Sequence, residues 1–117
     1  MEKIDAVVAL AALAQDNRLD VFRLLVRAGP EGMPAGEIAS ALKLAPNTLT
    51  FHFDKLRAAG LIRVQRNGRS MIYAARFETM NNLIDYLTEN CCGGRAQCLP
   101  KTRSTAGQRE RRYVRAR

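Results

Sequence analysis

Residues 61–75, LIRVQRNGRSMIYAA, restrict the fold more than any other segment, because apolar and polar residues alternate on both sides of Asn67-Gly68. A period of two residues is typical of a strand with one buried face. Asn-Gly tolerates the positive φ angles of a tight type I′ turn, so the segment predicts a two-stranded β-hairpin. One face of this hairpin is expected to be lined by Ile62 and Val64 before the turn, and by Ile72 and Ala74 after it.

Four helices are predicted before this hairpin and one after it. The apolar run from Ala6 to Ala14 suits a buried first helix. Asp16 or Asn17 can cap a second helix, which AGPEGMP (residues 28–34) ends. The second helix is expected to bury a stripe of Leu19, Phe22, Leu25 and Val26. Two helices, AGEIASALKL and PNTLTFHFDKLRAAG, precede the hairpin, and the last helix is expected from about Phe77 to Asn90, with Gly93-Gly94 as its stop.

Two short helices joined by a tight connection and followed by a basic hairpin describe a winged helix-turn-helix. The predicted class is therefore mainly α (α+β), with about five helices and a two-stranded wing. We expect residues 1–90 to form a DNA-binding and dimerisation domain, residues 91–98 a separate cysteine segment, and residues 99–117 a basic, disordered tail. Acidic residues near the start argue against a signal peptide, and no run is long enough to span a membrane, so we expect a cytoplasmic protein.

The charge of the chain points to a polyanionic partner. The formal net charge is +8, but residues 40–76 hold seven basic side chains against one acidic, a local charge of +6. Such a block between mildly acidic segments indicates a nucleic-acid surface. The tail carries a similar block, which either adds non-specific DNA affinity or is an extension without a role in the site.

Small polar side chains on the fourth helix suit base edges and phosphates in a major groove. The predicted DNA contacts on that helix are Asn47, Thr48, Thr50, His52 and Lys55. Arg66 and Arg69 flank the hairpin turn and can reach the DNA backbone or minor groove, whereas Arg63 is expected to be solvated. His52 is the only histidine, so we interpret it as a DNA contact or a fold-supporting residue rather than a metal ligand.

One recognition helix gives little specificity, and two copies related by a dyad would read half-sites about 34 Å apart. The two terminal helices carry more apolar surface than a small domain readily buries. We therefore expect a homodimer with operator DNA as its partner, and an interface that includes Ile4, Val8, Leu83, Ile84 and Leu87.

The stretch NTLTFHFDKLRAAGLIRVQRNGRSMIYAA closely resembles the recognition helix and wing of the ArsR/SmtB family of metal-responsive repressors. The shared pattern is a Ser or Thr before His, a Leu three residues on, an AGL segment, and Arg-x-Gly-Arg followed by Tyr. In helix order the resemblance covers roughly residues 5–90. It implies a homodimer that binds operator DNA without ligand and releases it when ligand binds.

All three cysteines of the chain, Cys91, Cys92 and Cys98, lie within ENCCGGRAQC. An odd number in a reducing compartment does not favour a disulfide scaffold. A structural zinc site needs four ligands, and a thiol at the end of a helix is poorly placed for catalysis, so we expect no enzyme. Three thiols suit a soft three-coordinate centre such as As(III) or Sb(III), and Gly93-Gly94 allows the reversal that brings Cys98 back.

The family resemblance narrows the ligand further. EIASALKL lacks the Cys-x-Cys of many arsenic sensors, and the last helix has Asp85 and Glu89 but no His for a zinc site. The remaining pattern resembles the arsenical repressors with a C-terminal Cys-Cys-x5-Cys triad. The resemblance thus implies a repressor of an arsenic-resistance operon, with As(III) or Sb(III) as inducer. Two alternatives stay open: a thiol redox-responsive repressor of the same fold, and a constitutive DNA-binding module with structural cysteines.

Overall fold

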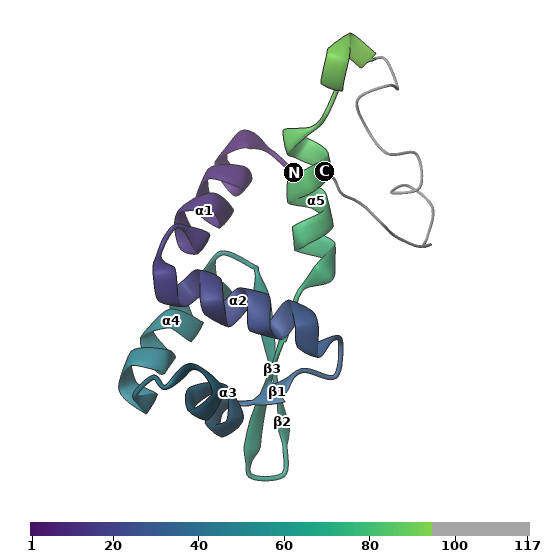
Figure 1. The fold of residues 1–117 in the computed structure, drawn as a ribbon. Coiled ribbons are helices and arrows are strands. Elements are labelled where there is room, and N and C mark those ends of the chain that lie inside the picture. Colours follow the sequence, from purple (N-terminus) through teal and green to yellow (C-terminus); the bar gives the residue numbers. More distant parts are fainter. Residues whose placement is uncertain (95–117) are drawn as a thin grey trace. The chain divides into compact units, whose positions relative to one another are not determined.

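Residues 1–94, the part of the chain that the computed structural model describes, form a winged helix-turn-helix with five α-helices and a three-stranded antiparallel sheet (Figure 1). The elements run in the order α1 (Lys3–Leu13), α2 (Asp16–Ala28), β1 (Met33–Pro34), α3 (Ala35–Leu42), α4 (Pro46–Ala58), β2 (Ile62–Asn67), β3 (Ser70–Ala75), α5 (Phe77–Leu87) and a 3-10 turn, η1 (Cys91–Gly94). Every predicted helix is present, so the predicted fold is confirmed.

The first helix buries its small residues and exposes its large ones. The core face of α1 consists of Ala6, Ala9 and Ala12, at a spacing of three residues that keeps them on one side of the helix. Its larger apolar side chains point outward, so α1 is not the fully buried helix that its composition predicts. Exposed on α1 are Ile4, Val7, Val8 and Leu10.

The second helix forms the centre of the core. Gln15 caps it by accepting a hydrogen bond from the Arg18 amide at 2.9 Å, so the cap lies one residue before the predicted Asp16. Phe22 and Leu25 are buried as predicted, but Val21 takes the place of Leu19, which is 44% exposed. The buried stripe thus lies closer to Val21 than predicted.

The sheet has one strand more than the sequence predicts. Met33 and Pro34 form β1 and pair with Tyr73 and Ile72 of β3, which gives the strand order β1-β3-β2. Two residues are too few for a period to show in the sequence. Gly32, just before β1, has a φ of +75°, and a Cβ there would lie 2.4 Å from the carbonyl oxygen of Tyr73. Only glycine permits this approach.

The hairpin turn is shifted by one residue from the predicted position. Asn67 pairs with Ser70, so the two loop residues are Gly68 and Arg69. Gly68 has a φ of +65°, whereas Arg69, the second loop residue, lacks the positive φ that a type I′ turn would require. A glycine with positive φ at the first loop position is the pattern of a type II′ turn, and the predicted type I′ turn is wrong.

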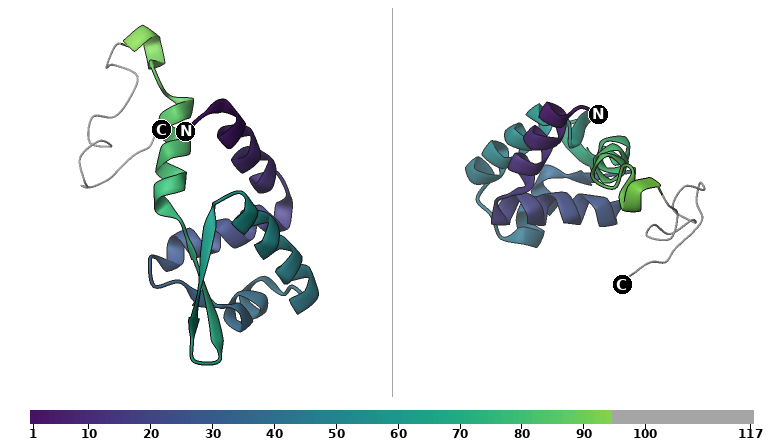
Figure 2. Two further views of the ribbon diagram at one scale, coloured as in Figure 1. Left: turned by 180° about the vertical axis from the view of Figure 1, so that it is seen from behind. Right: turned by 90° about the horizontal axis from the view of Figure 1, so that it is seen from above.

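The register also corrects the predicted faces of the hairpin. Ile62 pairs with Ala75 and Val64 pairs with Tyr73, so these four residues share one face. Ile72 and Ala74 belong to the opposite face. The alternation did not separate the two faces because Ala74 and Ala75 are both buried. At its base the hairpin contacts α2 and α4, whereas its turn extends beyond the helices (Figures 1 and 2).

The last helix is shorter than predicted. It ends at Leu87 rather than Asn90, and the Glu89 amide donates to the carbonyl of Tyr86, three residues back, which tightens the final turn. Asn90 then adopts a left-handed φ of 57°. The compact helical unit spans Met1–Leu83, and a second unit begins at Ile84, inside α5. The predicted tail, residues 99–117, lies outside the described residues. Within residues 1–94, no helix has the length and apolar character needed to cross a bilayer.

Candidate nucleic-acid interface

The helix-turn-helix consists of α3 and α4, joined by three residues. Lys43 ends α3 in the left-handed conformation with a φ of 57°, and the Leu44 amide donates to the carbonyl of Ala39 at 3.1 Å. Pro46 then occupies the first turn of α4, where its missing N–H costs no helical hydrogen bond. Leu49, Phe53 and Leu56 are buried, which fixes the face that α4 turns toward solvent.

Four of the five side chains predicted on α4 as DNA contacts are exposed. They are Asn47, Thr48, Thr50 and Lys55. The Thr50 hydroxyl donates to the carbonyl of Pro46 at 3.0 Å, so its oxygen and methyl group remain for a partner. Lys55 extends over the ring of Phe51, with its Nζ 5.3 Å from the ring centroid. This face offers amide, hydroxyl and ammonium groups, as a base-reading helix requires.

His52 corrects the prediction, because its side chain lies in the core and not on the DNA-facing side. Only 4% of the residue is exposed, and no hydrogen bond reaches Nδ1 from residues 1–94. Burial lowers the pKa of His52, and the charge of Arg18 lowers it further. His52 therefore supports the fold as a neutral imidazole. The sequence pattern missed this because His52 lies between Leu49 and Leu56 at helical spacing.

Phe51 is a feature of the interface that the sequence interpretation missed. It is 53% exposed on α4, and the edge of its ring packs against His52 with centroids 5.6 Å apart. The signal was available, because an angle of 100° per residue places Phe51 opposite the buried Leu49 and Phe53. The prediction for this face included polar side chains only, and Phe51 is apolar.

The wing presents Arg66 and Arg69 as predicted, both exposed at its far end. Arg63 differs from its prediction. It is half-buried, and its Nη2 donates to the carbonyl of Pro30 at 3.0 Å, which ties β2 to the loop after α2. Arg63 is thus a structural residue rather than a solvated one.

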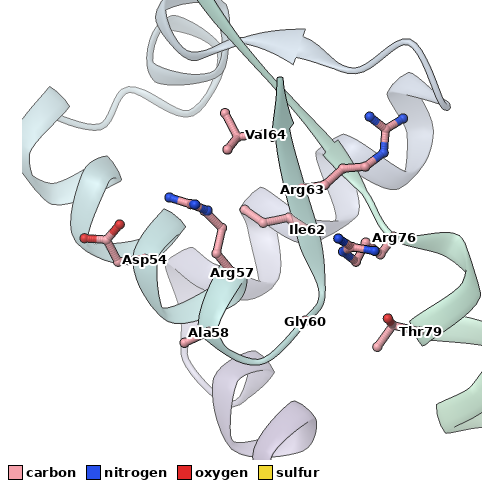
Figure 3. A pocket seen from close by; sticks show the side chains of 9 residues that line it. All are labelled: Asp54, Arg57, Ala58, Gly60, Ile62, Arg63, Val64, Arg76 and Thr79. Atoms are coloured by element: carbon pink, nitrogen blue, oxygen red, sulfur yellow. The ribbon is translucent and has the colours of Figure 1, made fainter. Parts of the chain in front are cut away.

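Two further basic residues of the +6 block, Arg57 and Arg76, lie away from the wing tip. A pocket of about 630 Å³ lies beside β2. Figure 3 shows the side chains that line it, which come from β2, the C-terminal end of α4 and the start of α5. Arg57 and Arg76 line it, and Asp54 is its one acidic residue. No hydrogen bond or ion pair engages the guanidinium of either arginine within residues 1–94. Apart from Lys43, which follows α3, the positive charge of the block is therefore divided between the wing and the outward face of α4 on one hand and this pocket on the other.

Two of the three cysteines lie in the described part of the chain, in the turn after α5. Cys92 has a left-handed φ of 56°, and the Sγ atoms of Cys91 and Cys92 are 3.7 Å apart. Cys91 is a free thiol, whereas Cys92 is disulfide-bonded.

The complete cysteine site remains a prediction, because Cys98 lies outside the described residues. Within residues 1–94, no group of three His, Cys, Asp or Glu side chains is placed to hold a metal ion. The Sγ atoms of Cys91 and Cys92 are neighbours, but Cys92 is disulfide-bonded, so the three-thiolate site stays a prediction.

Comparisons with known proteins agree with this geometry. A family model described as a helix-turn-helix domain matches residues 13–65, from the end of α1 into β2. The transcriptional activator HlyU of Vibrio cholerae is 28% identical over 87 residues, which are 74% of this chain and 78% of HlyU. Its structure superposes with a TM-score of 0.61, covering 79% of this chain and 99% of the HlyU chain.

Two further structures carry the ArsR name. An ArsR family transcriptional regulator is 26% identical with a TM-score of 0.65, covering 77% of this chain and 90% of its own. A homodimeric winged helix-turn-helix DNA-binding domain from Mycobacterium bovis, described as a possible ArsR-family regulator, is 18% identical. Its TM-score is 0.60, with 80% of this chain and 86% of that chain covered, and it supports the fold alone. Fold and sequence are thus similar to those of winged-helix transcriptional regulators, two of which are described as ArsR-like.

Proposed function

We propose that this protein is a homodimeric transcriptional repressor of the ArsR/SmtB family, which leaves its operator when As(III) or Sb(III) binds the thiolates of Cys91, Cys92 and Cys98. The observation that carries the DNA-binding part is the exposed polar face of α4 beside a wing with two exposed arginines. The sensing part rests on the sequence pattern of the triad. Cys91 and Cys92 are adjacent, with their Sγ atoms 3.7 Å apart, and the disulfide of Cys92 must be reduced before this sulfur can bind the ligand.

Dimerisation is supported by apolar side chains that the single chain leaves exposed on α1. Ile4 is 66% exposed and Val7 is 53% exposed, on the helix face opposite the buried alanines. In the second unit, Leu87 of α5 is 57% exposed. Apolar residues gathered on one face of a helix favour a contact with a partner. A dimer through the terminal helices places two copies of α4 on successive turns of DNA.

Release of DNA requires that the ligand distinguish two states of the dimer. Moving the population from 99:1 bound to 1:99 needs about 5.5 kcal/mol of differential affinity. Soft thiolates prefer soft centres, so metalloid–sulfur bonds suit this requirement. Closing the turn after α5 around the ligand changes the end of a helix that we assign to the dimer interface, and so changes the spacing of the two recognition helices.

The test uses a fluorescent operator duplex, obtained by selecting bound sequences from a random pool, with the protein kept under reducing conditions. Arsenite added in increments is expected to lower the fluorescence anisotropy of wild type to that of free DNA. Cys91→Ser, Cys92→Ser and Cys98→Ser variants are expected to stay bound. A Thr88→Ser variant, altered in the same turn without loss of a thiol, is expected to respond like wild type.

Mass spectrometry of the native protein separates binding from release. The expected adduct is one arsenic per chain with the loss of three protons, and it is absent from each cysteine variant. If wild type keeps its DNA at saturating arsenite, or Cys98→Ser releases normally, the sensing proposal is wrong, although the DNA-binding proposal stands.

A second candidate is a thiol redox switch, because Cys92 is disulfide-bonded while the adjacent Cys91 is free. An oxidant would then release the operator by forming a disulfide, and a dithiol would restore binding. Release by peroxide but not by arsenite would favour this alternative. A protein that keeps its operator with both reagents would be a constitutive DNA-binding module.

A further inference from the structure

The exposed face of α4 has an aromatic ring at its centre. With 100° between successive residues, Asn47 and Lys55 lie about 40° on either side of Phe51, and Thr48 about 60° away. The buried Phe53 and Leu56 lie on the opposite side. Phe51 therefore projects in the direction in which a recognition helix meets the floor of the major groove.

The exposure of Phe51 has no explanation within the single chain. It is 53% exposed, and it is the only aromatic residue among the exposed large hydrophobic residues of positions 1–94. Its neighbours hold the ring in place without covering it. His52 packs against the ring at 5.6 Å, and Lys55 extends past it with Nζ at 5.3 Å from the centroid. Two contacts of this kind restrict the ring's orientation before any partner binds.

A phenylalanine ring cannot donate or accept a conventional hydrogen bond, so it does not recognise most base edges. The exception in the major groove is thymine, whose C5-methyl group is apolar. Contact between an apolar side chain and this methyl group distinguishes thymine from cytosine and from uracil. The Thr48 hydroxyl and the Asn47 amide beside the ring can serve the hydrogen-bonding edges of neighbouring bases.

We propose that Phe51 is a specificity-determining residue that reads the C5-methyl group of a thymine in each half-site. This inference rests on the proposed DNA-binding function and adds to it the base that the central position of α4 selects. It makes the recognition of that base depend on apolar contact rather than on charge, so this discrimination should change little with salt, unlike total affinity.

Deoxyuridine provides the test, because it removes only the methyl group and keeps every hydrogen-bonding edge of thymine. A duplex is selected from a random pool with the full-length wild type, and each thymine is then replaced singly by deoxyuridine. At one position per half-site, wild type is expected to bind the deoxyuridine duplex about four-fold more weakly, the effect of removing one buried methyl group. Phe51→Ala is expected to bind the two duplexes equally.

Matched variants separate the effect of the Phe51 ring on base discrimination from any effect on folding. Phe51→Leu keeps an apolar contact and should retain part of the discrimination, whereas Phe51→Gln should lose it. Leu19→Ala removes an exposed apolar side chain of α2 and should discriminate like wild type. Circular dichroism and thermal unfolding confirm that each variant is folded, as expected for substitutions at an exposed site.

The outcomes separate this inference from the function on which it rests. If no duplex is enriched by wild type, the DNA-binding proposal fails and this inference fails with it. If a duplex is enriched but no thymine responds to deoxyuridine, or Phe51→Ala and Phe51→Gln discriminate as wild type does, the DNA-binding proposal stands and the assignment of Phe51 is wrong.

Discussion

The ring of Phe53 on α4 stacks on the ring of Tyr73 on β3, with centroids 3.7 Å apart and planes inclined by 15°. Tyr73 pairs with Val64 across the hairpin, so this stack joins the recognition helix to both strands of the wing. Burial raises the pKa of Tyr73, an effect that Arg57 opposes and Asp54 assists. The two elements that we assign to DNA binding are thus held as one piece by a contact within the core.

We expect this stack to contribute coupling energy between the helix and the wing. Phe53→Leu and Tyr73→Leu should each lower the free energy of unfolding. The double variant should be destabilised by less than the sum, with a coupling of about 0.5–1.5 kcal/mol for the aromatic pair. Urea denaturation of the four proteins measures this cycle. If the two single-variant losses in the free energy of unfolding add up to that of the double variant, the rings have no interaction energy.

Gly32 and Gly60 offer a comparison between backbone strain and steric overlap. Both have a φ of +75°, but a Cβ on Gly32 would lie 2.4 Å from the Tyr73 carbonyl oxygen, and a Cβ on Gly60 would meet nothing within 4 Å. Gly60→Ala should lower the free energy of unfolding by about 1–2 kcal/mol, the cost of the left-handed conformation. Gly32→Ala should cost clearly more, because β1 must move away from β3. Equal destabilisation in chemical denaturation would contradict this interpretation of the β1–β3 contact.

The sequence predicted those parts of the fold that show a period over several residues. The helices and the hairpin were recognised because their apolar positions repeat. The two-residue strand β1 has no period, and its formation depends on Gly32 and on a partner strand about 40 residues away. Likewise the predicted faces of the hairpin are wrong because Ala74 and Ala75 are both buried, and the distant elements that pack against β3 determine that burial.

The sequence predicted most of the residues of the candidate site but not which way each side chain points on α4. Thr48 and Lys55 are exposed as predicted. The polar residue His52 is buried, however, and the apolar residue Phe51 is exposed. Their order along α4 decides this, since position 52 faces the core whatever residue occupies it. The side chain of Arg63 binds Pro30, 33 positions earlier in the chain, and nothing local in the sequence indicates that contact.

The stability of the fold should depend on pH through His52, the only histidine in the chain. Its pKa in the folded state lies below the ordinary value of 6.5, so below about pH 6.5 the unfolded chain binds more protons than the folded one. Stability is therefore highest above that pH and falls as the pH drops toward the folded pKa, by at most about 1.4 kcal/mol per pH unit. Thermal unfolding between pH 7 and 5 measures how the free energy of unfolding changes with pH. In a His52→Gln variant this pH dependence should be smaller. An unchanged slope would show that other groups dominate.

The division of the positive charge predicts two classes of arginine. Arg66→Ala with Arg69→Ala should reduce the salt dependence of operator binding, with the logarithmic slope falling by about 0.9 for each phosphate that is no longer neutralised. Arg57→Ala with Arg76→Ala removes the same charge from the pocket beside β2 and should leave the slope nearly unchanged. Anisotropy titrations at four salt concentrations distinguish the pairs, and equal reductions would place the pocket against DNA as well.

The outward face of α1 should control the oligomeric state without controlling the fold. Ile4 and Val7 contribute little to the core of the single chain, which α1 joins through Ala6, Ala9 and Ala12. Ile4→Glu with Val7→Glu should therefore convert a dimer to a folded monomer, because two copies of the face would each bury uncompensated carboxylates. Light scattering after size-exclusion chromatography gives the mass, and circular dichroism checks the helices. Leu19→Glu, at another exposed apolar site, should remain dimeric.

A monomer should also bind operator far more weakly, since it contacts one half-site instead of two. A dimer that persists in the α1 variant would show that the outward face of α1 is not required for the interface.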